Sequence, residues 1–327
     1  MLNWLVVGIG DITTKRVIPA IKAEPRSRLL GVVSRDAAKG STFGERVWTD
    51  LESALDDRTI DAVYIGTPVF LHAPQTILSL RAGKHVLCEK PMAMNYEEAD
   101  RMQRAAEESG KTLGIAYYRR MYPKVHRARE LLASGAIGTP VIAELTCHSW
   151  FNAEGGARGW LLEPDKAGGG PLYDIASHRI DLLNFFFSKP VRVSAHLSNA
   201  VHANPVEDNA TVLIDYECGV RGVVDVRWHS RVYRDEFRIR GTEGEINLDP
   251  LNGPVLVHPG GKEELPAHSN LHYPCIENFV GAVMGSAPLY ASGASSLLTD
   301  WVTEQARVGR IPRIPRSATA PYGFSLS

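Results

Sequence analysis

The sequence predicts an α/β protein of two domains: a doubly wound parallel sheet, then an α+β domain built on a broad sheet of antiparallel strands. Through residue 120, short apolar runs alternate with helix-like segments, a pattern typical of βαβ units. The first apolar run ends in the glycine turn Gly8-Ile9-Gly10. Beyond Val191 strand-like runs follow one another, separated by turn residues. We therefore expect one domain over residues 1–120 and a second over residues 121–327.

Composition and charge exclude several classes of function. The 327 residues suffice for two domains, and 44% hydrophobic with 22% charged residues is ordinary for a globular protein. A net charge of -1 offers no attraction for nucleic acid, so Arg119-Arg120 is interpreted as a site or surface charge. No apolar run is long enough to span a membrane. Four scattered cysteines without a CxxC pair indicate a reducing compartment. We expect a cytoplasmic protein without nucleic-acid or membrane partners.

The first strand and its glycine turn are typical of a dinucleotide site. The apolar run Leu2–Val7 leads into the turn, and a helix-compatible segment follows over 14–23. Gly8 permits the tight turn, and Gly10 lets the backbone approach a pyrophosphate at the helix N-terminus. Thr13 stands at the third glycine position, so the fingerprint is incomplete, and a plain tight turn would explain the glycines equally well.

The end of the second strand bears on the choice of cofactor. The apolar run 29–33 ends in Ser34-Arg35-Asp36, about where a second strand meets the adenosine ribose. Ser34 and Arg35 offer a hydroxyl and a guanidinium, which suit a 2′-phosphate. Asp36 would instead favour the free 2′-hydroxyl of NAD. We favour NADP over NAD; the other interpretation is a polar surface turn.

Alternation continues through the rest of the first domain. Strands are predicted at 47–48, 62–66, 85–88 and 112–116, and helices at 37–44, 50–55, 72–82 and 96–109. Because ligands bind at the carboxyl ends of parallel strands, one crevice is expected to collect the residues there: Gly8, Ser34, Thr67 and Lys90.

The second domain begins with a helix and continues mainly as strands. Helices are predicted at 124–134, 273–284 and 295–307, strands at 141–150, 191–197, 210–216, 220–229, 236–240, 245–248 and 255–257, and loop from Pro312. Helices can cover one face of this sheet, and we expect a partner subunit on the other.

A glycine triplet precedes two side chains suited to proton transfer. Gly168-Gly169-Gly170 is followed by Pro171, which is welcome in a first helical turn. On one regular helix Asp174 and His178 are four residues apart and share a face. A carboxylate and an imidazole can move a proton near neutral pH. Local pattern alone fits a buried histidine held for packing equally well.

Several motifs together resemble the glucose–fructose oxidoreductase, inositol dehydrogenase and rhizopine-catabolism family (Gfo/Idh/MocA). The resemblance covers nearly the whole chain. It rests on Gly83-Lys84-His85-Val86-Leu87-Cys88-Glu89-Lys90-Pro91, on the glycine triplet with Asp174 and His178, on Gly8-Ile9-Gly10-Asp11-Ile12 and on Arg120-Met121-Tyr122-Pro123. It implies a Rossmann domain, a C-terminal domain with an open, mostly antiparallel sheet, and assembly into homodimers or homotetramers through that sheet.

The resemblance also implies roles for residues. Lys90 would contact the substrate hydroxyl and the nicotinamide ribose, with Asp174 and His178 completing the catalytic set. The implied cofactor contacts are Gly8, Gly10, Asp11, Ile12, Ser34, Arg35, Thr67, Pro68, His72, Glu89, Lys90 and Arg120.

The chemistry gives each catalytic residue a reason. His178 is the best acid/base, because the ordinary pKa of histidine is about 6.5. Lys90 is suited to stabilise a developing alkoxide and to lower the pKa of His178 by like-charge repulsion. Asp174 would hydrogen-bond the substrate hydroxyl or orient the imidazole.

The chain departs from the family pattern in places. Ala176 stands where glycine is common, and Leu161 follows Trp160 where an arginine often does. Arg158 is a candidate replacement for that arginine. Trp160 would stack on a sugar or simply pack.

The expected activity is hydride transfer between NADP and a secondary alcohol or carbonyl of a sugar, cyclitol or related polyhydroxy compound. The alternatives are a dehydrogenase of a non-sugar cyclic diol, a non-catalytic cofactor-binding regulator, and a metal hydrolase. The hydrolase lacks a third ligand at recognisable spacing beside Asp174 and His178, so no metal is expected.

Overall fold

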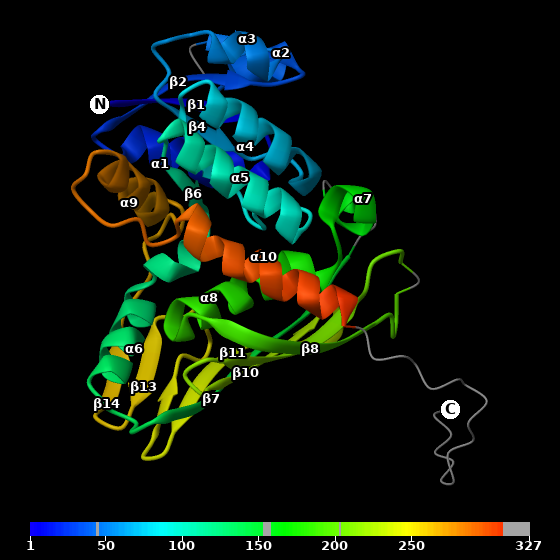
Figure 1. Cartoon of the computed structure of the whole chain (residues 1–327), viewed down its shortest axis with the longest axis vertical. Coiled ribbons are helices and arrows are strands. Elements are labelled where there is room, and N and C mark those ends of the chain that lie inside the picture. Colours follow the sequence, from blue (N-terminus) through cyan, green and yellow to red (C-terminus); the bar gives the residue numbers. More distant parts are fainter. Residues whose placement is uncertain (44–45, 153–157, 203, 310–327) are drawn as a thin grey trace.

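The computed structural model describes residues 1–43, 46–152, 158–202 and 204–309. The chain from Pro312, predicted as loop, lies outside these ranges. Two sheets make up the molecule, one above the other in Figure 1, and helix α10 runs across their junction. Within the described ranges no helix combines the length and apolarity needed to cross a lipid bilayer.

The first sheet is the predicted doubly wound parallel sheet. Its six strands are all parallel and lie in the order β3-β2-β1-β4-β5-β6. The strands are β1 (Leu2–Val7), β2 (Ser27–Val33), β3 (Arg46–Trp48), β4 (Ala62–Ile65), β5 (His85–Cys88) and β6 (Leu113–Ile115). Helices on both faces bury β1, β4 and β5 almost completely, which explains their continuous apolar runs.

The helices of this domain follow the predicted alternation. They are η1 (Thr13–Val17), α1 (Ile18–Ala23), α2 (Ala37–Ser41), α3 (Leu51–Leu55), η2 (Val69–Leu71), α4 (His72–Arg81) and α5 (Tyr96–Ser109). Asp50 caps α3 by accepting from Ser53 N at 2.8 Å. The first helix differs from expectation, because η1 is a π-helical turn ahead of a short α1. One face of the sheet packs against α3, α4 and α5, and the other against α1.

The C-terminal part of the chain also completes this first core. Helix α9 (Tyr273–Val283) buries Ile276, Phe279 and Val280 against the first sheet, and Phe279 packs on Trp4 with ring centroids 5.4 Å apart. The sequence assigned this helix to the second domain. The apolar face of this helix packs against the first domain instead. Amphipathic periodicity shows that a helix has an apolar face, but not which domain that face packs against.

The second sheet is open and mostly antiparallel, as the resemblance implied. Its eight strands lie in the order β14-β13-β12-β11-β7-β10-β9-β8, with β7 and β10 parallel. They are β7 (Pro140–Trp150), β8 (Pro190–Ser198), β9 (Asn209–Tyr216), β10 (Arg221–Arg227), β11 (His229–Gly241), β12 (Glu245–Asn247), β13 (Val255–His258) and β14 (Gly261–Glu264). Strand β11 is longer than predicted, and β14 was not predicted.

Helices cover one face of the second sheet. The remaining helices are η3 (Tyr118–Met121), α6 (Pro123–Ala133), η4 (Gly159–Leu162), α7 (Pro164–Ala167), η5 (Leu172–Ala176), α8 (Ser177–Phe187) and α10 (Gly293–Val308). Residues of α6, α8 and α10 share one core with the inward side chains of the strands. Helix α10 packs on both α5 and α8 and so joins the domains (Figure 1).

Candidate active site

The glycine turn has the geometry that a dinucleotide requires. Gly8 has φ 90°, and a Cβ atom there would lie 2.9 Å from the carbonyl oxygen of Gly66. A Cβ atom at Gly10 would meet no heavy atom within 4 Å, so the backbone borders open space at the start of the helix. Thr13 fits the third position because its methyl group packs where Gly66 has no side chain. These residues fit a dinucleotide pyrophosphate.

The end of β2 and the start of α2 carry two cations, and the carboxylate of Asp36 there already serves as a helix cap. Ser34 Oγ donates to Asp36 O at 2.7 Å, and Asp36 Oδ1 accepts from Lys39 N as the cap of α2. Arg35 is exposed. Lys39 Nζ donates to Ile9 O at 2.8 Å, which brings a second cation onto the glycine turn. The sequence interpretation missed Lys39, although a basic residue in the helical turn after Ser34 is a visible signal.

The loops after β4 and β5 are tied together by His72. This buried ring lies 2.8 Å from Thr67 O and 2.9 Å from Pro91 O. Burial lowers the pKa of His72. Thr67 Oγ1 bonds Gln75 at 2.7 Å, and Pro68 begins the turn η2. His72 thus holds the two loops that border the predicted crevice.

Glu89, the residue before Lys90, is held by several hydrogen bonds. Its Oε1 accepts from Tyr64 OH at 2.6 Å and lies 3.1 Å from His272 Nε2, and its Oε2 accepts from Lys90 N at 3.1 Å. Burial by itself raises the pKa of Glu89, but the hydrogen bond from His272 and these other partners hold it at about 2. Glu89 is therefore a fixed anion next to Lys90.

Lys90 reaches across to the second domain. Its Nζ lies 2.9 Å from Asp174 O and 3.2 Å from Asp174 Oδ1. Arg158 Nη2 donates to Asp174 Oδ2 at 2.7 Å, so each carboxylate oxygen faces a cation. Burial raises the pKa of Asp174, but the positive charges of Lys90 and Arg158 lower it by more. The net pKa therefore lies below the ordinary value. The carboxylate therefore stays ionised and binds these cations instead of the imidazole of His178.

The segment carrying Asp174 is not the regular helix that was predicted. Residues Leu172–Ala176 form a π-helical turn, and α8 begins only at Ser177. Glu207 Oε1 accepts from Gly170 N at 2.9 Å and from Leu172 N at 3.0 Å, so it satisfies amides at the start of the turn. A side chain at Gly170 would collide with the backbone of Glu207, which explains one glycine of the triplet.

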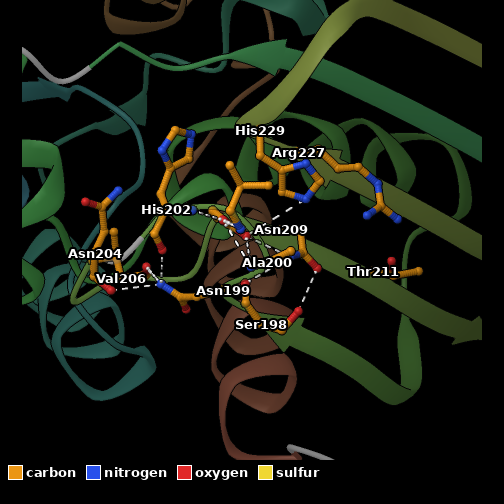
Figure 2. Close-up of polar contacts among 12 residues, drawn as sticks. Ser198, Asn199, Ala200, His202, Asn204, Val206, Asn209, Thr211, Arg227 and His229 are labelled. Atoms are coloured by element: carbon orange, nitrogen blue, oxygen red, sulfur yellow. Dashed lines mark hydrogen bonds and ion pairs between the residues drawn. The ribbon is translucent and has the colours of Figure 1, made fainter. Parts of the chain in front are cut away.

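The loop that presents Glu207 is held by its own polar network (Figure 2). Asn199 Nδ2 donates to the carbonyl oxygens of Asn204 at 2.8 Å and Val206 at 2.7 Å. The buried Asp208 carboxylate accepts from three successive amides, including Val201 N and His202 N, both at 2.8 Å. This network holds the loop together, and Glu207 within it accepts from the amides at the start of the π-helical turn.

His178 lies one turn beyond Asp174 in an aromatic setting. It is buried, and its ring packs edge-on against Tyr117 and Tyr118, at centroid distances of 6.0 and 5.2 Å. Burial lowers the pKa of His178 well below 6.5, with added repulsion from Arg119 and Lys90. The imidazole is therefore neutral at physiological pH and able to accept a proton.

Comparison with protein families decides the identity of this arrangement. Residues 2–117 match the model of an oxidoreductase family with an NAD-binding Rossmann fold. Residues 125–247 match the C-terminal domain of the GFO/IDH/MocA proteins. The chain belongs to the Gfo/Idh/MocA family of oxidoreductases.

Named relatives of this family act on sugars and diols. The chain is 31% identical to 1,5-anhydro-D-fructose reductase of Ensifer adhaerens over 309 residues, 90% of this chain and 91% of that protein. It is 29% identical to trans-1,2-dihydrobenzene-1,2-diol dehydrogenase of Mus musculus, covering 88% and 85%. The crystal structure of aldose-aldose oxidoreductase from Caulobacter crescentus complexed with glycerol matches with a TM-score of 0.84, at 25% identity, covering 94% and 98%. This Gfo/Idh/MocA protein is therefore an oxidoreductase with a nicotinamide-dinucleotide-binding domain.

Arg120, which the resemblance assigned to the cofactor, is bound by other residues of the protein. It is buried, with Nε 2.8 Å from Asp181 Oδ2 and Nη2 2.5 Å from Oδ1, and Nη1 donates to Tyr290 O and Ser295 Oγ. These bonds join η3, α8 and the start of α10. Its contact with the cofactor stays a prediction, and the structure gives it a place at the domain junction.

Trp160 belongs to a wall of aromatic and apolar side chains beside the triplet. It packs against a small cluster containing Phe151, Leu161 and Trp228, in which Phe151 and Trp228 stack at 4.2 Å. Arg158 lies over Phe151 at 5.3 Å. Within the described ranges no group of three or more His, Cys, Asp or Glu side chains is arranged to hold a metal ion.

Proposed function

We propose that this protein is an NADP-preferring oxidoreductase that transfers hydride between its cofactor and a secondary alcohol or carbonyl of a sugar, cyclitol or related polyhydroxy compound. One observation supports this most: Lys90, from the end of β5, meets Asp174 at 3.2 Å, and His178 follows on the same helical segment. Three groups suited to alcohol oxidation thereby converge from two domains. A purely regulatory protein would not need this convergence.

Each residue has a distinct task in this proposal. The bound nicotinamide supplies or accepts the hydride. His178 is neutral and takes the proton from the substrate hydroxyl, or returns it in the reverse direction. Lys90 lies beside that oxygen and stabilises the alkoxide that forms. Asp174 holds the ammonium of Lys90 through two atoms and fixes its direction.

The preference for NADP rests on the residues after β2. Arg35 and Lys39 place two cations around the predicted ribose position, and Asp36 is used as a helix cap. Guanidinium and ammonium groups bind a 2′-phosphate by charge-assisted hydrogen bonds. Glu89, Thr67, Pro68, Asp11 and Ile12 are proposed to border the rest of the cofactor.

The substrate class rests on the named relatives and on the site. A sugar or cyclitol suits the cationic and aromatic wall formed by Arg158 and Phe151. A non-sugar cyclic diol is the second candidate, because a diol dehydrogenase is 29% identical over 301 residues.

We further propose a homodimer or homotetramer formed through the second sheet. The face opposite the helices carries ion pairs such as Arg227–Asp225 and exposes Leu213, which is 40% accessible. A second copy would cover this face. Light scattering should give at least twice 35.9 kDa, and a monomer would contradict assembly.

A reduction screen tests the proposed activity. Aldoses, inositols, anhydro-sugars, amino-sugars and cyclic diols would be offered with NADP or NAD, and reduction followed at the nicotinamide absorbance. We expect turnover with at least one class and a higher kcat/KM with NADP. Turnover with none of them, in either direction, would contradict the proposal.

A further inference from the structure

Arg119 is a buried cation beside the proposed site that has no role so far. It belongs to the turn η3 after β6 and is only 8% exposed. Its guanidinium lies over the ring of Tyr118 at 4.9 Å, and the ring of His178 packs edge-on against the same tyrosine with centroids 5.2 Å apart. Arg119 is also the strongest electrostatic influence on His178 among its charged neighbours.

One of the hydrogen-bond donors of Arg119 has no acceptor among the described residues. Its Nε donates to Asn252 Oδ1 at 3.3 Å, while its buried Nη1 meets no acceptor among the described residues. Throughout those same ranges no carboxylate forms an ion pair with it; the nearby Asp235 pairs with Arg179 at 3.0 Å. A buried guanidinium with a free donor is costly, and such donors in native proteins are commonly matched by a ligand or ordered water.

Two further ring nitrogens near Tyr118 share this property. The Nδ1 atoms of His178 and His272 are buried and have no hydrogen-bond partner among the described residues. The ring of His272 lies 5.0 Å from that of Tyr118. Three polar groups around Tyr118 therefore lack partners among the described residues, and one of them belongs to the proposed acid/base His178. The arrangement is suited to a ligand with several oxygen atoms.

We propose that Arg119 is a substrate-binding residue whose Nη1 donates to an oxygen atom on the carbon next to the one oxidised. The inference rests on the proposed function, since it places Arg119 beside the substrate of His178. It adds a requirement on that substrate: an acceptor oxygen, hydroxyl or carboxylate, adjacent to the reacting alcohol. A vicinal diol or a 2-hydroxy acid satisfies this requirement, and an isolated secondary alcohol does not.

Kinetics of Arg119→Met and Arg119→Lys test the assignment. With NADP saturating, Arg119→Met should raise KM for the best substrate of the screen on the order of 10- to 100-fold, since hydrogen bonds to charged groups contribute this much. Arg119→Lys should recover part of the loss. The control is Arg129→Met, because Arg129 also lies over an aromatic ring, Phe185 at 4.2 Å, but is exposed and outside the site.

A deoxy substrate analogue makes the test specific. For a sugar oxidised at C1, such as D-glucose, the analogue is 2-deoxy-D-glucose, which lacks the adjacent oxygen. The wild type should lose about as much kcat/KM on the analogue as Arg119→Met loses on the parent sugar, and the variant should lose little more on the analogue. Additive losses would overturn the inference, as would a variant impaired in binding NADPH with its KM for substrate unchanged. Offering a 2-hydroxy acid in place of the sugar shows whether the adjacent oxygen can be a carboxylate as well as a hydroxyl.

A binding measurement separates this inference from the proposed activity. Melting of the NADPH complex would be followed with each screen compound for wild type, Arg119→Met and Arg119→Lys. A compound that stabilises wild type and Arg119→Lys but not Arg119→Met supports the role of Arg119 even if no compound is turned over. Equal shifts in all three proteins, or no shift in any of them, would overturn it.

Discussion

Lys90 Nζ lies 2.9 Å from the carbonyl oxygen of Asp174 and 3.2 Å from its Oδ1, which links the end of β5 to the turn ahead of α8. The two residues are 84 positions apart: Lys90 follows strand β5 of the first sheet, and Asp174 lies on the turn η5. The ammonium group is thereby aimed by two acceptors, and a long flexible side chain gains a defined direction.

Replacing Lys90 by Met should lower kcat by about two to three orders of magnitude, because a cation that stabilises developing charge is lost. Binding of NADPH, measured by titration, should change little. The control is Lys189→Met, whose amine pairs with Glu217 at the surface at 2.7 Å. A Lys90→Met protein as active as wild type would refute the catalytic assignment.

His178 sets the expected acid limb of activity. Its pKa lies well below 6.5 because of burial, with repulsion from Arg119, Lys90, Arg179 and His272. A base whose pKa is depressed stays neutral as pH falls past 6.5, so kcat/KM for oxidation should hold its plateau there. Removing a neighbouring cation, as in Arg119→Met, raises the pKa of His178 and should move the limb to higher pH. A limb at or above pH 6.5 in the wild type would contradict the described environment.

The same shift predicts how stability depends on pH. Below about pH 6.5 the unfolded chain protonates this histidine while the folded protein does not, so stability should fall as pH falls. A His178→Gln variant should lose less stability over that interval than wild type. Melting temperatures in matched buffers would show the difference, and parallel curves would argue against it.

Glu207 is expected to support both stability and turnover. In Glu207→Ala the buried amides of Gly170 and Leu172 lose an acceptor, at a cost of about 1–3 kcal/mol each. The loosened turn should also lower kcat, because Asp174 lies on it. Glu217→Ala removes an exposed carboxylate and should change stability by less than about 1 kcal/mol. Urea unfolding of both variants measures the contrast, and similar losses would remove the special role of Glu207.

Arg35 and Lys39 should discriminate between cofactors. Changing either to Ala should weaken NADPH binding about tenfold or more and leave NADH binding nearly unchanged, because only the 2′-phosphate gains a charge-assisted bond. Lys22→Ala, an exposed lysine on α1, serves as the control. Equal losses for both cofactors would point to a role away from the 2′ position.

Arg120 separates a structural role from a cofactor role. Arg120→Met leaves the buried carboxylate of Asp181 without its cation, which should lower the free energy of unfolding by about 3–5 kcal/mol. NADPH affinity of the folded variant should stay close to wild type. If stability is kept and NADPH affinity falls, the contact predicted from the resemblance is the correct one.

The sequence by itself determined the order and type of most elements and the parts of the site that lie on short motifs. Continuous apolar runs predicted the buried parallel strands, since helices cover both of their faces, and glycines marked the turn after β1. Lys90, Asp174 and His178 stand within short motifs, so the resemblance of those motifs to a known family was enough to select them as candidates.

Only the tertiary structure decided which groups meet. Four features depend on segments that meet only in the folded chain: the pairing of Arg158 with Asp174, the support of the triplet by Glu207, the position of Lys39 on the glycine turn and the burial of Arg119. Helix α9 covers the first sheet because the uncovered apolar face lies there, a fact about surfaces that periodicity along one helix does not contain. Side-chain partners depend on distance in space, and a sequence specifies that only through the whole fold.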